Sequence, residues 1–190
     1  MQGGIHLQAI QTFDETVILF IQAHFHNPVT DAIFPLITAL GNAGIFWILS
    51  AVLLLFFRKT RKWGLLLGIA LAGTFVLNDL LIKPLAARPR PCDLFPAIEL
   101  LIRRPASYSF PSGHSASSFS AAVVLFHGNR RLGILALLLA ALIAFSRVFL
   151  FVHFPTDILT GALLGSSVAL LLCGVLKKQK KLPAPFYQKS

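Results

Sequence analysis

Charged side chains are scarce in this chain of 190 residues: only 13% are Asp, Glu, Lys or Arg, whereas 56% are hydrophobic. A soluble domain carries about 25% charged residues on average, so this chain cannot cover a water-exposed surface with polar groups. The mean hydropathy of +0.76 leads to the same conclusion. The composition therefore excludes a soluble globular domain and indicates an integral membrane protein.

Acidic residues and cysteines are also few. Seven Asp and Glu stand against 17 Lys and Arg, which gives a formal net charge of +10. The basic residues lie between long apolar stretches rather than on an amphipathic surface with interleaved aromatics, so we expect lipid head groups and phosphate as partners, and no nucleic acid. Cys92 and Cys173 are far apart and provide neither a disulfide framework nor a metal-ligand cluster.

Long apolar stretches are abundant. A bilayer core about 30 Å thick needs roughly 20 apolar helical residues. Residues 63–82 meet this length most clearly, and residues 42–57, 132–152 and 156–176 are also predicted to be spans. The segment 113–127 is shorter and rich in serine and alanine, which let helices approach closely in lipid, so we expect it inside a bundle.

The N-terminal part allows two interpretations. Residues 1–27 contain an amphipathic, interfacial segment, most evident at 13–25, and residues 28–40 form a further short span after the Asn27-Pro28 break. The sequence therefore predicts an all-α, polytopic membrane helix bundle that forms a single domain over 1–190. We expect about six transmembrane helices, or five and an interfacial helix, followed by a basic cytoplasmic tail at 177–190. The pattern does not indicate an oligomeric state.

The positions of lysines and arginines predict the direction of the spans. Clusters at 58–62, 130–131 and 177–181 fall on one side when the spans are threaded in order. By the positive-inside rule, this side is cytoplasmic. The long connection 83–111 and the turn around His153 then lie outside, and connections of this length are usually functional. We expect a multi-pass protein of the inner (plasma) membrane with an extracytoplasmic active site.

Basic residues on the outer face break this trend, namely Lys83, Arg88, Arg90, Arg103, Arg104 and Arg147. Cations retained where topology disfavours them need a local partner, and a phosphate dianion is the best candidate. The surrounding residues fall into three segments at the same ends of their helices. These segments are Lys83 with Arg90-Pro91, then Pro111-Ser112-Gly113-His114, and finally Ser146-Arg147 with His153 and Asp157.

This pattern resembles the signature of the type-2 phosphatidic acid phosphatase superfamily, the integral-membrane lipid phosphate phosphatases. That signature is K-x6-RP, PSGH and S-R-x5-H-x3-D, and each of its fixed positions is matched in order between Lys83 and Asp157. The resemblance implies a six-helix membrane bundle. It also implies hydrolysis of a lipid phosphate through a phosphohistidine, without a metal or other cofactor.

The resemblance also implies roles for individual residues. His153 would be the nucleophile, which divides one difficult displacement into two easier steps. Asp157 would fix the tautomer of that imidazole, and His114 would protonate the leaving oxygen. The residues implied to bind the phosphoryl oxygens are Lys83, Arg90 and Arg147, with the hydroxyl of Ser112 and backbone N–H groups at Gly113.

The roles of Arg88 and Asp79 stay open at this point. Arg88-Pro89 is a second Arg-Pro step, so Arg88 is an alternative phosphate ligand, although the spacing favours Arg90. Asp79 lies one helical turn before Lys83, and an i,i+4 ion pair would position the lysine. A helix-packing role shared with Asn78 is equally open.

Resemblance to small bacterial members of the family implies undecaprenyl diphosphate as the substrate and undecaprenyl phosphate as the product. Phosphatidylglycerol phosphate or phosphatidate is the alternative. A non-catalytic lipid-phosphate binder or transporter could use the same cations. Neither of these, however, needs a nucleophile, an orienting carboxylate and a second histidine at these spacings.

Overall fold

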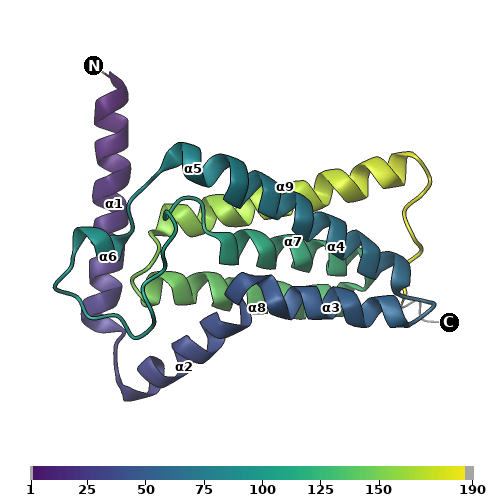
Figure 1. Ribbon diagram of the computed structural model, residues 1–190, viewed down its shortest axis with the longest axis horizontal. Helices are drawn as coiled ribbons and strands as arrows, with labels where there is room; N and C mark the ends of the chain where they lie inside the picture. The colour runs from purple at the N-terminus through teal and green to yellow at the C-terminus, as the bar shows by residue number, and fades with distance from the viewer. Residues whose placement is uncertain (1, 187–190) are drawn as a thin grey trace.

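The computed structural model describes residues 2–186, with side chains from residue 8 onward, and every regular element within this range is helical. The main bundle consists of α3 (Ile45–Phe56), α4 (Arg61–Phe75), α7 (Gly113–Gly128), α8 (Arg130–Phe149) and α9 (Pro155–Lys178), which run roughly along one axis (Figure 1). At one end, α1 (Gln2–His24) lies across the bundle and α2 (Pro28–Leu40) slants toward it. The short helices α5 (Lys83–Ala86) and α6 (Pro91–Leu94) interrupt the connection to α7. The predicted all-helical class is confirmed.

Capping residues explain where several helices begin. The side-chain oxygens of Asn27 and Asn129 each accept hydrogen bonds from two backbone N–H groups in the first turns of α2 and α8. Pro28 and Pro155 are the first residues of α2 and α9, a position at which the missing N–H of proline has no intrahelical partner to lose. The start of α9 at Pro155 therefore follows directly on the turn that carries His153.

Within the described residues, three helical stretches are long and apolar enough to cross a membrane: Arg61–Leu94, Arg130–Phe149 and Pro155–Lys178. A fourth is added if α2 and α3, expected as separate spans, count as one span bent by 41° around η1 (Asn42–Gly44). Leucines on the outside of the bundle, such as Leu65, Leu135 and Leu163, are exposed, as a lipid-facing surface requires. The membrane character is confirmed, but the count of about six spans is not.

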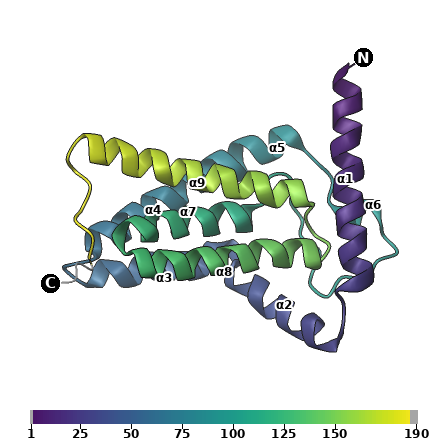
Figure 2. The ribbon, with the colours of Figure 1, turned by 180° about the vertical axis from the view of Figure 1, so that it is seen from behind.

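The short helix α7 occupies the middle of the bundle and packs against α4, α8 and α9 (Figure 2). Its small side chains at Ser115, Ser118 and Ala121 are fully buried. A Cβ atom on Gly165 of α9 would stand only 1.9 Å from the carbonyl oxygen of Ala116, so glycine is required for this approach. The prediction that segment 113–127 lies inside the bundle is confirmed, and the close contact fixes α9 against α7.

The three basic clusters lie together at the end of the bundle remote from α1 (Figure 1). There, the predicted tail is partly an extension of α9, which continues to Lys178, and partly a return to the bundle. The indole N–H of Trp63 donates to the carbonyl of Ala184 at 3.0 Å, and the N–H of Phe186 donates to the carbonyl of Gly128 at 3.0 Å. Residues 187–190 of the predicted tail lie outside the described residues.

Helix α1 is longer than the amphipathic segment predicted at 13–25. Its side chains at Ile18 and Ile21 are buried against the turn between α8 and α9, whereas those of Phe13 and Phe20 are exposed. The helix stands nearly perpendicular to the bundle in both views (Figures 1 and 2). Its interfacial location stays a prediction, and Met1 lies outside the described residues.

Candidate active site

Three segments that are distant in the sequence meet at the α1 end of the bundle and line one cavity of about 870 Å³. They are the connection after α4, the start of α7, and the end of α8 with the turn that follows it. The predicted site residues that line the cavity are Asp79, Lys83, Arg90, Gly113, His114, Arg147 and His153. Both imidazoles therefore border the same cavity, as the motif pattern requires.

His153 lies in the turn between α8 and α9, and the backbone holds this turn firmly. The N–H groups of Val152 and His153 both donate to the carbonyl of Arg147, each at 3.2 Å. Phe151 has a φ of 60°, an uncommon left-handed conformation for a bulky residue. The His153 side chain is only 2% exposed, and Phe154 and other apolar residues pack around the turn. The imidazole thus has a fixed position.

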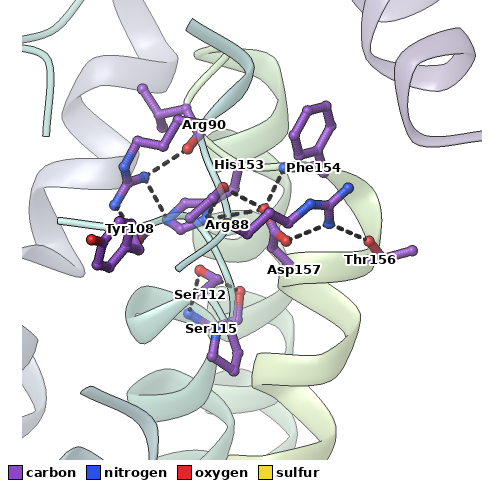
Figure 3. A network of polar contacts seen from close by, with 12 residues as sticks. Arg88, Arg90, Tyr108, Ser112, Ser115, His153, Phe154, Thr156 and Asp157 are labelled. Atoms are coloured by element: carbon purple, nitrogen blue, oxygen red, sulfur yellow. Dashed lines mark hydrogen bonds and ion pairs between the residues drawn. The ribbon is translucent and has the colours of Figure 1, made fainter. Parts of the chain in front are cut away.

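Arg90 determines which nitrogen of His153 can react. Nη1 of Arg90 lies 3.1 Å from Nε2 of His153 (Figure 3). A guanidinium group can only donate hydrogen bonds, so Nε2 must accept and the proton must reside on Nδ1. The nitrogen of the His153 ring that carries no proton is therefore Nε2.

Asp157 and Ser109 lie on the Nδ1 side of the ring. Oδ2 of Asp157 is 3.6 Å from Nδ1 of His153, and the Oγ atom of Ser109 is 3.5 Å from the same nitrogen. The same carboxylate oxygen accepts hydrogen bonds from the Ser109 hydroxyl at 2.5 Å and from the N–H of Phe154 at 2.8 Å. These bonds hold the carboxylate at the start of α9, where the helix dipole favours negative charge. The arrangement suits a group that orients the ring.

The protonation state of His153 follows from its surroundings. Burial lowers the pKa of the His153 imidazole well below its usual value of 6.5, and the positive charges of Arg90, Arg147 and Lys83 lower this pKa further. His153 is therefore neutral near pH 7, which is the state that a nucleophile needs.

Two buried arginines, Arg90 and Arg147, provide hydrogen-bond donors at the wall of the cavity. Arg90 is 3% exposed and is held by the carbonyl oxygens of Val152 and Ser107, at 2.6 and 2.7 Å. Arg147 is also 3% exposed, and its Nη1 donates to the hydroxyl of Thr38 at 2.6 Å. Its buried Nε has no hydrogen-bond partner among the described residues. Buried cations with an unused donor at a cavity wall suit a bound anion.

Lys83 and Asp79 form the i,i+4 ion pair that the spacing suggests. Asp79 belongs to a π-helical stretch, η2 (Val76–Ile82), which the hydropathy pattern does not reveal and which is typical of functional sites. Asn78, in the same stretch, is buried and donates to the carbonyl of Pro111 at 3.4 Å. Both suggested contacts, the lysine pair and the packing through Asn78, are therefore present.

His114 is the second residue of α7, and its Nε2 lies 3.0 Å from Oδ1 of Asn42. A Cβ atom on Gly41 would stand 2.5 Å from the His114 ring, so the absence of a side chain at this position makes room for the imidazole. The Ser112 hydroxyl accepts hydrogen bonds from the N–H and hydroxyl of Ser115, at 3.4 and 3.2 Å (Figure 3). Ser112 thus caps the helix.

Arg88 contacts carboxylates rather than lining the cavity. Its Nη1 donates to Oδ1 of Asp157 at 2.7 Å, and its Nη2 donates to Oδ2 of Asp14 at 2.7 Å. Figure 3 shows the guanidinium of Arg88 on the side of Asp157 that faces away from the His153 ring. This geometry favours Arg90 over Arg88 as the phosphate ligand, in line with the spacing, and the ligand role itself stays a prediction.

The sequence reasoning missed the polar residues that support the predicted ones: Asp14, Thr38, Asn42, Ser109 and Thr156. Thr156 lies inside the third motif, one residue before Asp157, and Ser109 stands two residues before Pro111. Asp14, Thr38 and Asn42 lie far from the motifs in the chain. Among the residues that the structure describes, no group of three or more His, Cys, Asp or Glu is arranged to hold a metal ion.

Comparisons with known proteins show that the resemblance seen in the three motifs extends over most of the chain. Residues 61–181 match the family described as the PAP2 superfamily. An undecaprenyl-diphosphatase of Sulfolobus acidocaldarius is 37% identical over 126 residues, which cover 66% of this chain and 61% of that protein. Phosphatidylglycerophosphatase B of Bacillus subtilis is 31% identical over an alignment of 204 positions, gaps included, that covers 95% of this chain and 92% of that protein.

Solved structures give the same result for the fold. The crystal structure of a transmembrane PAP2-type phosphatidylglycerolphosphate phosphatase from Bacillus subtilis aligns with a TM-score of 0.77 at 29% identity. This alignment covers 93% of the present chain and 90% of that one. The family match spans more than half of the chain and includes all three motifs. The chain belongs to the PAP2 superfamily of membrane lipid phosphatases.

Proposed function

We propose that the protein removes the terminal phosphate of undecaprenyl diphosphate and releases undecaprenyl phosphate. The observation that carries the proposal is the shape of the cavity. One end holds His153 and the buried cations, whereas the other end is an apolar groove between α3 and α4. The groove is lined by Ile48, Val52, Leu55, Leu65, Ile69 and Phe75. A phosphate head and an apolar tail thus fit one continuous cavity.

In the first step, Nε2 of His153 attacks the terminal phosphorus, and the bond from phosphorus to the bridging oxygen breaks. Burial and the nearby cations lower the pKa of the His114 imidazole well below its usual value of 6.5, so His114 takes up a proton when the phosphate dianion binds. It then gives this proton to the leaving oxygen of the lipid phosphate. The carboxylate of Asp157, 3.6 Å from Nδ1, stabilises the positive charge that develops on the ring. The products of this step are a phosphohistidine and the lipid monophosphate.

In the second step, a water molecule attacks the phosphorus of the phosphohistidine and gives a proton to His114. The bond between nitrogen and phosphorus breaks, which releases inorganic phosphate and restores neutral His153. Arg90, Arg147 and Lys83 bind the phosphoryl oxygens in both steps, because positioned positive charge supplies most of the rate in phosphoryl transfer. The steps use no metal ion.

The reaction is proposed for the extracytoplasmic face of the inner (plasma) membrane. The three basic clusters lie at the end of the bundle opposite the turn between α8 and α9 that carries His153, and such clusters favour the cytoplasmic side. The cationic site would then face the outer leaflet, where a lipid head group is accessible while its tail stays in the bilayer.

A second candidate substrate is phosphatidylglycerol phosphate. It is favoured by the Bacillus subtilis relative, whose name states this substrate and whose alignment covers 95% of the chain. Undecaprenyl diphosphate is preferred because the Sulfolobus protein named for it has the higher identity, 37%. The two substrates share the same head-and-tail chemistry and differ in tail and head-group size.

The test is release of inorganic phosphate by the purified protein in detergent. We expect His153→Ala to abolish release from undecaprenyl diphosphate. The matched control is His127→Ala, because His127 lies at the far end of α7, where its Nδ1 bonds to the carbonyl of Val123. Full turnover by His153→Ala would overturn the mechanism. A higher kcat/KM for phosphatidylglycerol phosphate or phosphatidate would replace the substrate and leave the mechanism standing.

A further inference from the structure

Asp14 is a fully buried carboxylate on α1, far from the three motifs in the sequence. Its Oδ1 accepts a hydrogen bond from the backbone N–H of Thr156 at 3.0 Å, and its Oδ2 accepts one from the Thr156 hydroxyl. Oδ2 also accepts a hydrogen bond from Nη2 of Arg88 at 2.7 Å. A buried carboxylate is costly without such partners, so these bonds tie α1 to the first turn of α9.

Arg88 links Asp14 to the carboxylate beside the nucleophile. One terminal nitrogen of its guanidinium binds Asp14 and the other binds Asp157, each at 2.7 Å. Because the guanidinium is planar and rigid, it fixes the distance and angle between the two carboxylates. The Arg88 guanidinium also lies 4.2 Å above the ring of Phe154, which limits its movement. The group that orients His153 is therefore itself held in place from α1.

The charge of Arg88 affects the position of the Asp157 carboxylate. Two carboxylates share the single positive charge of Arg88, so Arg88 is not attracted to Asp157 alone. If Asp14 lost its charge, the guanidinium would be drawn to Asp157, and that carboxylate would turn away from Nδ1 of His153. The 3.6 Å separation from Nδ1 is already longer than a hydrogen bond, so a further small shift would weaken the charge interaction that orients the ring.

We propose that Asp14 is a positioning residue for catalysis, which acts through Arg88 to hold Asp157 against His153. The helix α1 is then part of the catalytic unit rather than an interfacial segment alone. This inference rests on the proposed function, because it assigns a support to the residue that orients the nucleophile. Asp14 lies outside residues 61–181, so the family match does not account for it.

The main test is Asp14→Asn, which keeps the shape of the side chain and removes its charge. We expect kcat for undecaprenyl diphosphate to fall by roughly 10- to 100-fold, as for a small misplacement of a catalytic group. The KM should stay unchanged, because the cations that bind phosphate are not touched. The matched control is Asp31→Asn on α2, where the carboxylate pairs with His26 at 2.7 Å, and this variant should keep the wild-type kcat.

A double-mutant cycle separates positioning from general stabilisation. If Asp14 acts through Asp157, adding Asp14→Asn to Asp157→Asn should not reduce kcat further. Independent losses that multiply in the double variant would overturn the inference. A purely structural role would also lower the melting temperature without the selective fall in kcat.

Arg88→Lys is the second variant, needed if Asp14→Asn does not fold. A lysine keeps the positive charge but cannot bridge two carboxylates in a fixed geometry, so we expect the same loss of kcat with KM unchanged. Wild-type kcat in folded Asp14→Asn, or in Arg88→Lys, overturns the inference and leaves the proposed function intact. A wild-type protein that releases no phosphate from any lipid phosphate overturns both.

Discussion

Gly68→Phe is expected to block the apolar groove and to select against long lipid tails. Gly68 lies on α4 in the groove wall, and a Cβ atom added there would meet no heavy atom within 4 Å. A phenyl ring can therefore enter the groove without displacing the protein. The groove follows α4 from Gly64 to Phe75, which at 1.5 Å per residue is about 16 Å, and the ring would close about the last 6 Å.

The expected loss of kcat/KM in Gly68→Phe depends on the medium that the displaced lipid tail enters. Transfer into water would cost about 0.8 kcal/mol for each methylene group. A tail that leaves the groove enters lipid or detergent, however, which is as apolar as the groove, so this hydrophobic cost nearly cancels. What remains is the loss of about ten packed atom pairs at about 0.1–0.2 kcal/mol each, or roughly 1–2 kcal/mol. We therefore expect kcat/KM to fall by about tenfold.

The assay compares kcat/KM for undecaprenyl diphosphate with that for geranyl diphosphate, whose short tail does not reach Gly68. Gly68→Phe should reduce the first value and leave the second unchanged. Gly174→Phe on α9 is the matched control, because Gly174 also has no heavy atom within 4 Å and lies away from the groove. Equal losses for both substrates, or no loss for the long one, would refute the assignment of the groove to the tail.

Three further predictions concern the site itself. Ser109→Ala removes a hydrogen bond to Asp157 that is worth about 1.5 kcal/mol, so kcat should fall by roughly tenfold while KM stays unchanged. A wild-type kcat in steady-state kinetics would contradict this prediction. The pKa of His153 is lowered in the folded state, so the unfolded state binds more protons below pH 6.5. The free energy of unfolding should therefore decrease by about 1.4 kcal/mol per pH unit as the pH falls toward the folded pKa. The melting temperature of the wild type should therefore drop more on acidification than that of His153→Gln, and equal drops would disprove the assignment. Excess chelator should leave phosphate release unchanged, whereas a loss that divalent metal restores would exclude the metal-free steps.

Hydropathy predicted the class of fold but not the shape of individual helices. The span 63–82 has the expected length, yet its last turns form the π-helical stretch η2 that carries Asp79. A residue inserted into a helix changes the hydrogen-bond register without changing the average hydropathy, so the pattern contains no sign of it. The bend at η1 and the return of the chain to Trp63 depend on contacts between distant residues, which hydropathy does not describe.

The motifs predicted which cations and histidines come together, because all of them lie at the same ends of their helices. Lys83, Arg90, Arg147 and both histidines line one cavity in the structure. Spacing could not decide how the neighbouring arginines divide their tasks. Arg88 and Arg90 are two residues apart in an extended segment, yet Arg88 binds Asp157 and Arg90 approaches Nε2 of His153. The two arginines differ in role because different partners lie within reach of each side chain.

Support for the site comes from residues whose role depends entirely on tertiary packing. Asp14 in an amphipathic helix would ordinarily face water, and its sequence neighbours contain nothing that needs a carboxylate. Its partner Thr156 is 142 residues away, at the start of α9. Only after α1 is placed across the bundle does the carboxylate become buried and require a cation, which Arg88 provides. The supporting residues therefore become recognisable from the charge balance of the folded protein, whereas the motif resemblance alone suggests His153 as the nucleophile.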